Sequence, residues 1–469
     1  MSEADSLFAV LKQSADAECA TALERFVRDA PDRQLSRVNV LDFARRQGLD
    51  EERALSTFLQ AAQIGLFDMS WNVLCPSCSG VLDANATLKT VRADQYYCVF
   101  CNVNAEPTLD DMVEVSFTVS PRARRIAAHS PDQLPLWEYY RQIFWGRGVD
   151  LPDDTLETAM QQVTLDAVEL PAGEKAFLSL QLPTGFVIVL EPVSHAAQFI
   201  NVKGEPTQDR QNLTLVYNNV RAPAGEMTMR PGPIRLSLEN RTATRVLPTI
   251  WVVDDKFIAA VGNRRPFLTA KRLLSNQTFR DIYRTDTLDV DQRLKITSLT
   301  FLFTDLKGST ELYERVGDLV AFDLVREHFR TLNEIVVAEG GAVVKTIGDA
   351  VMATFLTPDH ALAAALRMRE AMRKLNETHG REDLLLKIGI HEGRCLAVNL
   401  NERQDYFGQT VNIASRVQGL AQTRSILATA PVIDNPKSAS LLGDNDRKPL
   451  AQSHPLRGVA AEMAVYEIP

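Results

Sequence analysis

An apolar strand that ends on an acidic residue and turns at once into a helix is the feature that most constrains this chain. Residues 300–310 read Thr-Phe-Leu-Phe-Thr-Asp-Leu-Lys-Gly-Ser-Thr, so the apolar run stops at Asp305 and a glycine turn follows. From Glu311 onward the pattern predicts a long helix. A helix N-terminus at this point suits phosphate groups, and the carboxylate suits a divalent metal. The backbone N–H groups expected to face such a ligand belong to Leu306, Lys307, Gly308, Ser309 and Thr310.

A second carboxylate follows at the turn of a hairpin. Residues 342–355 read Ala-Val-Val-Lys-Thr-Ile-Gly-Asp-Ala-Val-Met-Ala-Thr-Phe, two strand-like halves around Gly348 and Asp349. If the helix between 310 and 338 crosses back over the sheet, Asp305 and Asp349 lie at adjacent strand ends. Two carboxylates that share two metals are a standard arrangement for phosphoryl chemistry. Taken singly, each aspartate is more typical of a cap or a turn.

A third group lies further along the chain. Residues 384–390 are strand-like, and residues 405–416 read Asp-Tyr-Phe-Gly-Gln-Thr-Val-Asn-Ile-Ala-Ser-Arg. Asn412 and Arg416 are four residues apart, which places both side chains on one face of a helix. An amide beside a guanidinium suits a ribose and a phosphate. Taken alone, the pair is more typical of a solvated helix surface.

Together these residues resemble the catalytic domain of the class III nucleotidyl cyclases. The resemblance covers residues 296–469, a little over a third of the chain, and the family's functional positions recur there with matching residue types and local spacings. It implies a ferredoxin-like core in which a strand, a helix, a hairpin, a helix and a strand follow one another. The expected activity is that of an adenylyl cyclase, which converts ATP to 3′,5′-cyclic AMP and pyrophosphate.

The resemblance also implies a role for each matching residue. Asp305 and Asp349 would bind two Mg²⁺ or Mn²⁺ ions, which hold the triphosphate and lower the pKa of the ribose 3′-hydroxyl. Lys345 matches the lysine that recognises a purine ring nitrogen, and Asp405 the position that accepts a hydrogen bond from the adenine amino group. Guanylyl cyclases of the family usually carry glutamate and a small residue there, so ATP is favoured over GTP.

The remaining family positions complete the expected site. Asn412 would orient the ribose, Arg416 would stabilise charge developing on the phosphoryl group, and Arg457 matches a basic position that contacts the terminal phosphates. In this family the active site forms between two catalytic domains, with the metal ligands from one and the other residues from its partner. Because this domain carries both sets, the resemblance implies a homodimer with two equivalent sites.

Four of the six cysteines form two Cys-x-x-Cys pairs within 27 residues. They are Cys75 and Cys78, then Cys98 and Cys101. Such pairs place four thiolates around one Zn²⁺ ion, and a site with four protein ligands leaves no open position, so the zinc is predicted to be structural. A redox dithiol pair and unrelated buried cysteines are the alternative interpretations.

The rest of the chain is predicted to form several parts of a multidomain α+β protein. Residues 1–70 are helical, with a pattern that suits a helix-turn-helix or a plain helical scaffold, and residues 71–130 form a zinc-ribbon-like segment. Residues 160–262 alternate short strands with Pro, Gly and Asn, which predicts an antiparallel all-β sandwich or barrel and a regulatory domain. Residues 263–295 are a connector with a helix from Pro266 through Tyr283. The Cys-Pro-Ser-Cys pair at 75–78, the alternating segment at 113–119 and Phe-Arg-Asp-Ile-Tyr at 279–283 also make the N-terminal two-thirds similar to an uncharacterised region found ahead of some bacterial cyclase domains.

The composition of the chain limits the classes of binding partner that are expected. The chain of 469 residues carries 60 acidic and 51 basic residues, a net charge of −9, and this acidic balance makes nucleic acid an unexpected main partner. No apolar run approaches the roughly 20 residues that span a bilayer, and the N-terminus lacks a secretory signal, so a cytoplasmic protein without a membrane segment is expected.

Three other functions compete with that of an adenylyl cyclase. A guanylyl cyclase is the alternative within the same family, and a zinc-dependent DNA-binding regulator with a nucleotide-sensing C-terminus is the alternative from another class. A diguanylate cyclase is disfavoured because its Gly-Gly-Asp/Glu-Glu-Phe hairpin is absent, since the hairpin here reads Thr-Ile-Gly-Asp at 346–349. The regulatory ligand or protein is not identified by the sequence.

Overall fold

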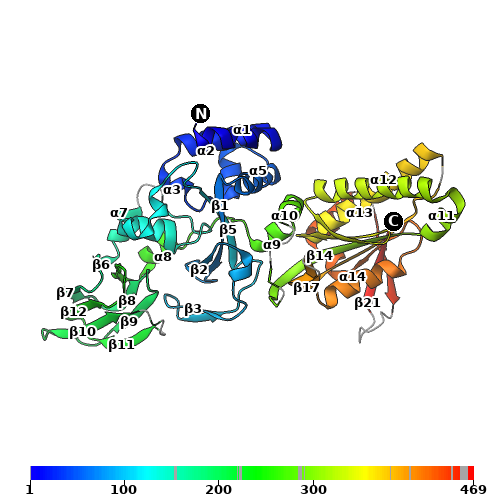
Figure 1. The fold of residues 1–469 in the computed structure, drawn as a ribbon. Helices are drawn as coiled ribbons and strands as arrows, with labels where there is room; N and C mark the ends of the chain where they lie inside the picture. The colour runs from blue at the N-terminus through cyan, green and yellow to red at the C-terminus, as the bar shows by residue number, and fades with distance from the viewer. Residues whose placement is uncertain are drawn as a thin grey trace. The chain divides into compact units, whose positions relative to one another are not determined.

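The computed structural model describes most of the chain. The described ranges are residues 2–152, 156–218, 220, 224–283, 288–289, 291–380, 382–400, 403–444, 447–454 and 463–469. They form two compact units with hydrophobic cores of their own (Figure 1). The first unit comprises Met1–Ala86, Asp94–Pro107 and Met112–Leu268, and the second comprises Thr87–Ala93, Thr108–Asp111 and Thr269–Pro469.

The first unit begins with helices that enclose buried phenylalanine rings. These helices are α1 (Glu3–Ser14), α2 (Ala17–Asp29), α3 (Asp32–Leu35), α4 (Val40–Gln47) and α5 (Glu51–Gln63). Helix α4 ends at Gly48, whose φ of 67° is the left-handed conformation that glycine adopts without strain. The ring of Phe58 on α5 lies 5.2 Å from the ring of Phe43 and 5.2 Å from that of Phe117. The apolar faces of α4 and α5 are therefore buried against each other and against the neighbouring sheet.

Two small antiparallel sheets follow and carry the cysteine pairs. Strand β1 (Phe67–Leu74) lies between β2 (Val81–Asn85) and β5 (Val113–Val119), and β3 (Tyr96–Cys98) pairs with β4 (Val103–Ala105). Cys75 comes directly after β1, and Cys98 is the last residue of β3. The strand predicted over 112–119 is β5, which starts one residue later.

The strands between residues 160 and 252 form two further sheets that share one core. One sheet has the order β11-β9-β8-β13-β6 and the other has the order β10-β12-β7. The strands are β6 (Thr164–Ala167), β7 (Lys175–Leu182), β8 (Gly185–Glu191), β9 (Ala196–Val202), β10 (Gln211–Tyr217), β11 (Gly225–Met229), β12 (Gly232–Asn240) and β13 (Thr249–Val252). Val189 of the first sheet and Leu236 of the second belong to the same buried cluster.

The prediction that these strands are all antiparallel is wrong for two pairs. Strands β10 and β12 run parallel, and so do β11 and β9. The reason is the path of the chain: after β10 it crosses to the other sheet as β11 and then returns as β12 in the same direction as β10. Short strand spacing alone does not distinguish this crossover from a series of hairpins.

Short helices flank these sheets and enclose an aromatic cluster. They are the 3₁₀ turns η2 (Ala127–His129) and η3 (Pro131–Gln133), α6 (Leu136–Tyr139), the π-helical turn η4 (Tyr140–Phe144), α7 (Leu156–Gln161) and α8 (Asp255–Val261). The rings of Tyr140 and Trp251 lie 5.0 Å apart, and those of Trp145 and Trp251 are stacked at 6.2 Å. All three side chains are almost completely buried.

The second unit starts with two short helices where a single one was predicted. The prediction of one helix from Pro266 through Tyr283 is wrong, because α9 (Ala270–Leu274) and α10 (Gln277–Ile282) are separate. Asn276 accounts for the break: its side chain accepts a hydrogen bond from the N–H of Phe279 at 2.9 Å and caps a new helix.

A large sheet forms the centre of the second unit. Its strand order is β15-β16-β14-β17-β19-β21-β20, with β18 paired to β17 outside that path. The strands are β14 (Leu294–Leu306), β15 (Ala342–Ile347), β16 (Ala350–Phe355), β17 (Leu386–Leu400), β18 (Arg403–Phe407), β19 (Ile426–Thr429), β20 (Leu450–His454) and β21 (Met463–Ile468). The helices and turns are η1 (Leu88–Thr90), α11 (Ser309–Val316), α12 (Asp318–Ala338), α13 (Pro358–His379), α14 (Gln409–Leu420), α15 (Ala430–Ile433) and α16 (Pro436–Asp444).

Helices cover both faces of this sheet (Figure 1). Successive residues of a strand point to opposite faces, and β19 shows the consequence. Ile426 belongs to the cluster that also contains apolar residues of α12 and α13, whereas Leu427 belongs to the cluster of α14. Among the described residues, no helix combines the length and apolar character needed to cross a bilayer.

Candidate functional site

Two aspartates lie together at one end of the large sheet. Asp305 is the penultimate residue of β14, and Asp349 lies in the turn between β15 and β16 after Gly348, whose φ is 63°. The N–H of Leu306 donates to Oδ2 of Asp349 at 3.3 Å. The antiparallel pairing of β14 with β16 brings the two strand ends together, which is the arrangement expected from the sequence.

Lys387 is a neighbour that the sequence reasoning missed. It lies opposite Asp305 in the antiparallel pairing of β17 with β14, and its Nζ is 2.7 Å from Oδ2 of Asp305. The two side chains are 22% and 30% exposed, so water reaches both. A strand at 384–390 was predicted, but the register that faces this lysine toward Asp305 depends on the assembled sheet.

The turn after β14 only partly follows the phosphate-binding expectation. Gly308 has a φ of 71°, and α11 begins at Ser309. In this structure the N–H of Leu306 donates to Asp349 and that of Lys307 donates to the carbonyl of Leu385 at 2.9 Å, so both are engaged and their role at a phosphate stays a prediction. The pairing of β14 with β17 extends through Leu306, and this explains why Lys307 is already engaged. The N–H groups of Gly308, Ser309 and Thr310 lie at the N-terminal end of α11, where an anion would be favoured.

Lys345 and Asp405 meet in the folded chain although 60 residues separate them. Nζ of Lys345, on β15, donates to Oδ2 of Asp405, on β18. The carboxylate is buried at 8% exposure and its other oxygen accepts the N–H of Tyr406 at 2.8 Å, whereas the lysine side chain is 42% exposed. A buried carboxylate held in place by its own strand, beside a cation that reaches solvent, provides one acceptor and one donor side by side.

Helix α14 presents the other two expected residues. Asn412 is exposed and Arg416 is half-buried, whereas Ile413 and Val417 are buried in a cluster with Leu427 of β19 and Val465 of β21. The backbone of α14 approaches β17 very closely, because a Cβ atom added at Gly389 would lie 2.1 Å from the backbone nitrogen of Gln418. This glycine lets the helix sit directly on the sheet. Arg457 lies outside the described residues.

Arg280 of α10 contacts both strands that carry the Lys345–Asp405 pair. Its Nη2 donates to the carbonyl of Gln404 at 2.9 Å and to that of Val344 at 3.4 Å, and its guanidinium lies 5.9 Å from the ring centre of Tyr406. Val344 and Gln404 are the residues next to Lys345 and Asp405 in the sequence. The sequence gives no indication of this contact, because an arginine on a predicted helix is usually solvated.

The four clustered cysteines converge on one point in the first unit. The Sγ atoms of Cys75, Cys78, Cys98 and Cys101 all lie within 4.8 Å of one another, and those of Cys78 and Cys98 are 3.8 Å apart. Tetrahedral zinc with bonds of about 2.3 Å places its sulfur ligands about 3.8 Å apart. None of the four forms a disulfide, and the donor set fits a zinc ion.

Two histidines in the second unit are buried in neutral surroundings. His328 on α12 is completely buried, and His391 on β17 shares a hydrogen bond with Oγ1 of Thr429 at 2.7 Å. Burial lowers the pKa of each imidazole to about 4. Both rings are therefore neutral at physiological pH, and their placement inside the fold suits packing.

Comparison with known protein families divides the chain between residues 281 and 292. Residues 1–281 match the model of a family of unknown function, DUF5939, and the chain belongs to that family. Residues 292–446 match the model described as the adenylate and guanylate cyclase catalytic domain. The chain therefore carries a class III nucleotidyl cyclase domain behind a region whose function is not described.

Relatives and solved structures match a little over a third of this chain. An adenylate cyclase of Anabaena cylindrica is 30% identical over 188 residues, which is 36% of this chain and 36% of that protein. Adenylate cyclase 2 of Rhizobium meliloti is 28% identical over 182 residues, 36% of this chain and 49% of that protein. The adenylyl cyclase CyaB from P. aeruginosa aligns with a TM-score of 0.34 at 23% identity, covering 38% of this chain and 96% of that one. The chain spans between 7% and 36% of the length of three adenylate cyclases that it matches.

Proposed function

We propose that the protein is an adenylyl cyclase that converts ATP to 3′,5′-cyclic AMP and pyrophosphate. The observation that carries this proposal is the contact between Lys345 and Asp405, in the same domain that places Asp305 beside Asp349. In the reaction the ribose 3′-oxygen loses its proton and bonds to the α-phosphorus. The bond from that phosphorus to the β-phosphate oxygen breaks, and pyrophosphate leaves.

The carboxylates of Asp305 and Asp349 fit divalent cations such as Mg²⁺ or Mn²⁺. Hard cations prefer oxygen ligands, and Asp349 is held beside the backbone after Asp305 by the N–H of Leu306. When bound, such ions supply charge neutralisation at phosphate oxygens and activate a hydroxyl nucleophile. Lys387 neutralises Asp305 in this structure, so we infer that this lysine gives up its contact when a cation binds.

The Lys345–Asp405 pair is proposed to select adenine. Adenine offers an amino donor beside a ring-nitrogen acceptor, and the pair offers a carboxylate acceptor beside an ammonium donor. The carboxylate is 8% exposed, so its position is constrained by the sheet around it. Guanine carries an oxygen where adenine carries the amino group, and that oxygen would face the buried Asp405 carboxylate.

The remaining residues are proposed to act on the ribose and the phosphates. Asn412 and Arg416 lie one turn apart on α14, and the packing of that helix on Gly389 holds it against the sheet. Asn412 orients the ribose hydroxyls, and the Arg416 guanidinium stabilises the negative charge that grows on the phosphoryl oxygens. Arg457 is assigned to the terminal phosphates on sequence grounds.

A homodimer through the catalytic domain is part of the proposal. Large apolar side chains stand exposed beside the candidate site residues: Ile347 is 53% exposed two residues after Lys345, and Phe407 is 63% exposed two residues after Asp405. Exposed apolar groups of this kind are typical of surfaces that pack against a partner. Two copies related by a twofold axis would bury these groups and create two equivalent sites.

The cysteine cluster is proposed to hold one structural Zn²⁺ ion in a ribbon-like segment. Four thiolates satisfy the tetrahedral preference of zinc and leave no open position. In this role Cys75 and Cys78 tie the end of β1 to the β3–β4 hairpin that carries Cys98 and Cys101. The helical and β-rich parts around it are proposed to regulate the cyclase.

Direct turnover measurements test the activity. Purified full-length protein with Mn²⁺ is expected to form cyclic AMP from ATP faster than cyclic GMP from GTP, and Asp305→Ala is expected to abolish both reactions. Asp323→Ala is the matched control, because Asp323 is an exposed aspartate on α12 with a side chain that is 71% exposed. Undiminished activity of Asp305→Ala would refute the site, and faster turnover of GTP would make the protein a guanylyl cyclase.

Mixing two inactive variants tests the dimer. Asp305→Ala removes a metal ligand and Arg416→Ala removes the phosphate-stabilising group, so each variant alone is expected to be inactive. In a homodimer with shared sites, half of the randomly paired dimers carry one variant of each kind, and each of these has one intact site. Co-expression is therefore expected to restore about a quarter of the wild-type activity, and no restoration would contradict a shared site.

A further inference from the structure

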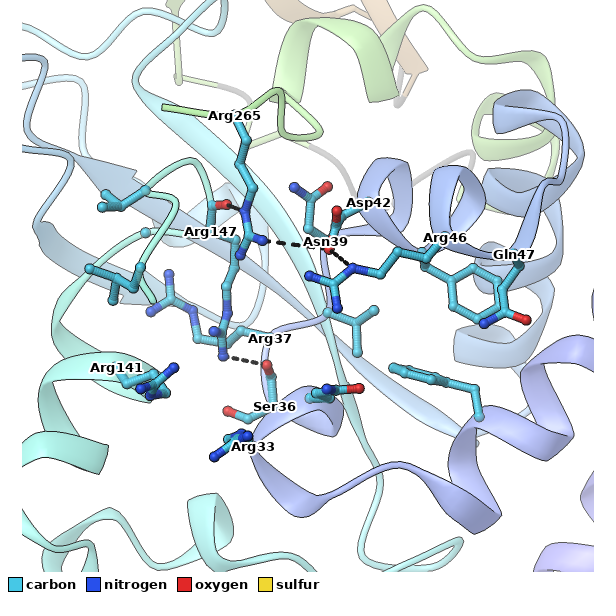
Figure 2. A pocket seen from close by; sticks show the side chains of 17 residues that line it. Arg33, Ser36, Arg37, Asn39, Asp42, Arg46, Gln47, Arg141, Arg147 and Arg265 are labelled. Carbon is cyan, nitrogen blue, oxygen red and sulfur yellow. Dashed lines mark hydrogen bonds and ion pairs between the residues drawn. The ribbon is translucent and has the colours of Figure 1, made fainter. Parts of the chain in front are cut away.

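A pocket in the first unit is lined by an unusual number of arginines. It has a volume of about 140 Å³ and lies between α3, α4, the turn η4 and the segment before Pro266 (Figure 2). Six arginines contribute to its lining: Arg33, Arg37, Arg46, Arg141, Arg147 and Arg265. Asp42 is the one acidic residue among the described residues that line it. On the scale where one water occupies about 10–15 Å³, this volume accommodates a small polyatomic anion.

The positive charge in the pocket exceeds the negative charge around it. Glu114 lies buried next to the pocket, where its Oε1 is 2.7 Å from Nη2 of Arg37. Six guanidiniums line the pocket, and they outnumber the carboxylates of Asp42 and Glu114. Glu138 and Asp150 lie 3.6 Å from Arg141 and Arg265, with side chains that are 31% and 58% exposed, and they offset part of this positive charge.

Arg37 and Arg147 are held in place by the fold, and each has a buried N–H donor without a described hydrogen-bond partner. Arg37 is 8% exposed and donates to the carbonyls of Ile143 and Trp145 at 2.9 and 3.3 Å, in addition to Glu114. The Nε atoms of Arg37 and Arg147 are buried and lack a hydrogen-bond partner among the described residues. Buried polar groups of this kind are rarely left unsatisfied.

The electrostatic environment agrees with this geometry. Burial and the nearby guanidinium of Arg37 lower the pKa of Arg147 to about 9, with Arg265 and Arg141 acting in the same direction. Burial is the largest cause of this lowered pKa, and the neighbouring guanidiniums of Arg37, Arg265 and Arg141 add to it. An anion in the pocket would favour the charged form of Arg147.

We propose that this pocket binds a small phosphate-bearing anion. Planar guanidinium forks match the oxygens of a phosphate group in bidentate fashion, and several forks that approach one space from different elements suit a group with two or more negative charges. The pocket lies entirely within the first unit. It is therefore separate from the nucleotide site proposed in the second unit, and the inference does not depend on the proposed function.

Pyrophosphate binding to the full-length protein tests the proposal. Equilibrium dialysis with labelled pyrophosphate and no added Mg²⁺ or Mn²⁺, at constant ionic strength set with NaCl, counts the bound anions without metal-dependent binding at the carboxylates. No chelator is added, so the proposed structural zinc stays in place. Tryptophan fluorescence locates the site, because all four tryptophans (Trp71, Trp137, Trp145 and Trp251) lie in the first unit. One pyrophosphate per chain is expected to bind, with a saturable fluorescence change that chloride at equal ionic strength does not produce.

Variants assign the binding to the pocket. Arg33→Gln combined with Arg141→Gln is expected to weaken binding at least about tenfold, since the removal of even one charge-assisted hydrogen bond has roughly that effect. Arg25→Gln is the matched control, because Arg25 is an exposed arginine of α2 outside the pocket lining. Asp42→Asn is expected to tighten binding severalfold, an increase that a misfolded protein would not show. Absence of saturable binding at millimolar pyrophosphate, or equal affinity in the double glutamine variant, overturns the proposal.

Discussion

The four-cysteine cluster and the two-aspartate end of the large sheet are both predicted metal sites, yet they differ in almost every physical respect. The cysteine sulfurs lie within 4.8 Å of one another, and three of the four residues are buried. The carboxylate of Asp305, in contrast, belongs to a side chain that is 30% exposed, and it contacts Lys387 at 2.7 Å. The cysteine cluster is largely buried and offers four sulfur ligands, whereas the two-aspartate end is open and has Lys387 as a counter-ion.

The difference shows that the number and the exposure of the ligands distinguish a structural metal site from a catalytic one. Four soft thiolates saturate tetrahedral zinc, so such a site stabilises the chain around it. Two carboxylates leave most positions of a hard cation free for water and substrate oxygens. Changes at the two sites should therefore affect different properties of the same molecule.

The largest effect is expected at the open site. Asp349→Asn keeps the size of the side chain and removes its charge, so activity should fall by about 10³-fold or more, since bound metals contribute several kcal/mol to such reactions. Turnover of ATP at saturating Mn²⁺ measures the loss, and the first unit should unfold at an unchanged temperature. A simultaneous loss of zinc in this variant would contradict the separation of the two sites.

At the cysteine cluster, a substitution is expected to lower the stability of the first unit. Cys101→Ser should reduce bound zinc from about one ion per chain to none and destabilise the first unit by about 3 kcal/mol or more, because zinc binding contributes folding free energy. Elemental analysis and tryptophan fluorescence during urea unfolding measure both effects. Cys19→Ala is the control, because Cys19 is buried outside the cluster and burial raises the pKa of its thiol to about 11. Full zinc content in Cys101→Ser would contradict the assignment of this ligand.

A smaller effect is expected for the preference between ATP and GTP. This preference should depend on residues of the proposed nucleotide site and not on the cysteine cluster. The double change Lys345→Glu with Asp405→Ser is expected to shift the ratio of kcat/KM for GTP over ATP by about 10- to 100-fold, the range that one or two hydrogen bonds give. Lys437→Glu, at an exposed lysine of α16, controls for the change of charge. An unchanged ratio would remove this pair from nucleotide recognition.

The smallest effect concerns pH and the stability of the catalytic unit. The folded pKa values of His328 and His391 lie near 4, below the usual 6.5, so the unfolded chain binds protons that the folded chain excludes. Stability is therefore expected to fall as the pH drops from about 6.5 towards 4, by on the order of 1–2 kcal/mol per histidine at pH 5. Urea unfolding of wild type and His328→Phe at pH 8 and pH 5 measures this. An equally steep pH dependence in the variant would show that His328 does not contribute.

Much of the candidate site was predictable because its residues are close in sequence. Asp305 follows its own strand, Asp349 occupies its own hairpin turn, and Asn412 and Arg416 share a helix face through their spacing of four. Periodicity also located β5. It could not distinguish a crossover from a hairpin, so the parallel pairing of β10 with β12 was missed.

Residues whose role depends on distant partners were not predictable in the same way. Lys387 reads as an ordinary strand residue until the register of β17 with β14 places it opposite Asp305. Arg280 reads as a solvated helix residue until α10 reaches the carbonyls of Val344 and Gln404. The single helix predicted from Pro266 through Tyr283 is divided at Asn276. There the side chain accepts one hydrogen bond from the N–H of Phe279 and caps a new helix.

The sequence by itself determined the chemistry that short spacings encode: two Cys-x-x-Cys pairs, a strand that ends on Asp305, and a helix face with an amide and a guanidinium. Only the tertiary structure decided what lies together across long separations, such as the contact of Lys345 with Asp405 and the six arginines around one pocket. The physical reason is that turn geometry, helix geometry and the Cys-x-x-Cys spacing involve residues only a few positions apart in the sequence. Charges, in contrast, interact through space. An arginine that the sequence pattern predicts to be solvated can therefore contribute to a region of high positive potential once the chain has folded.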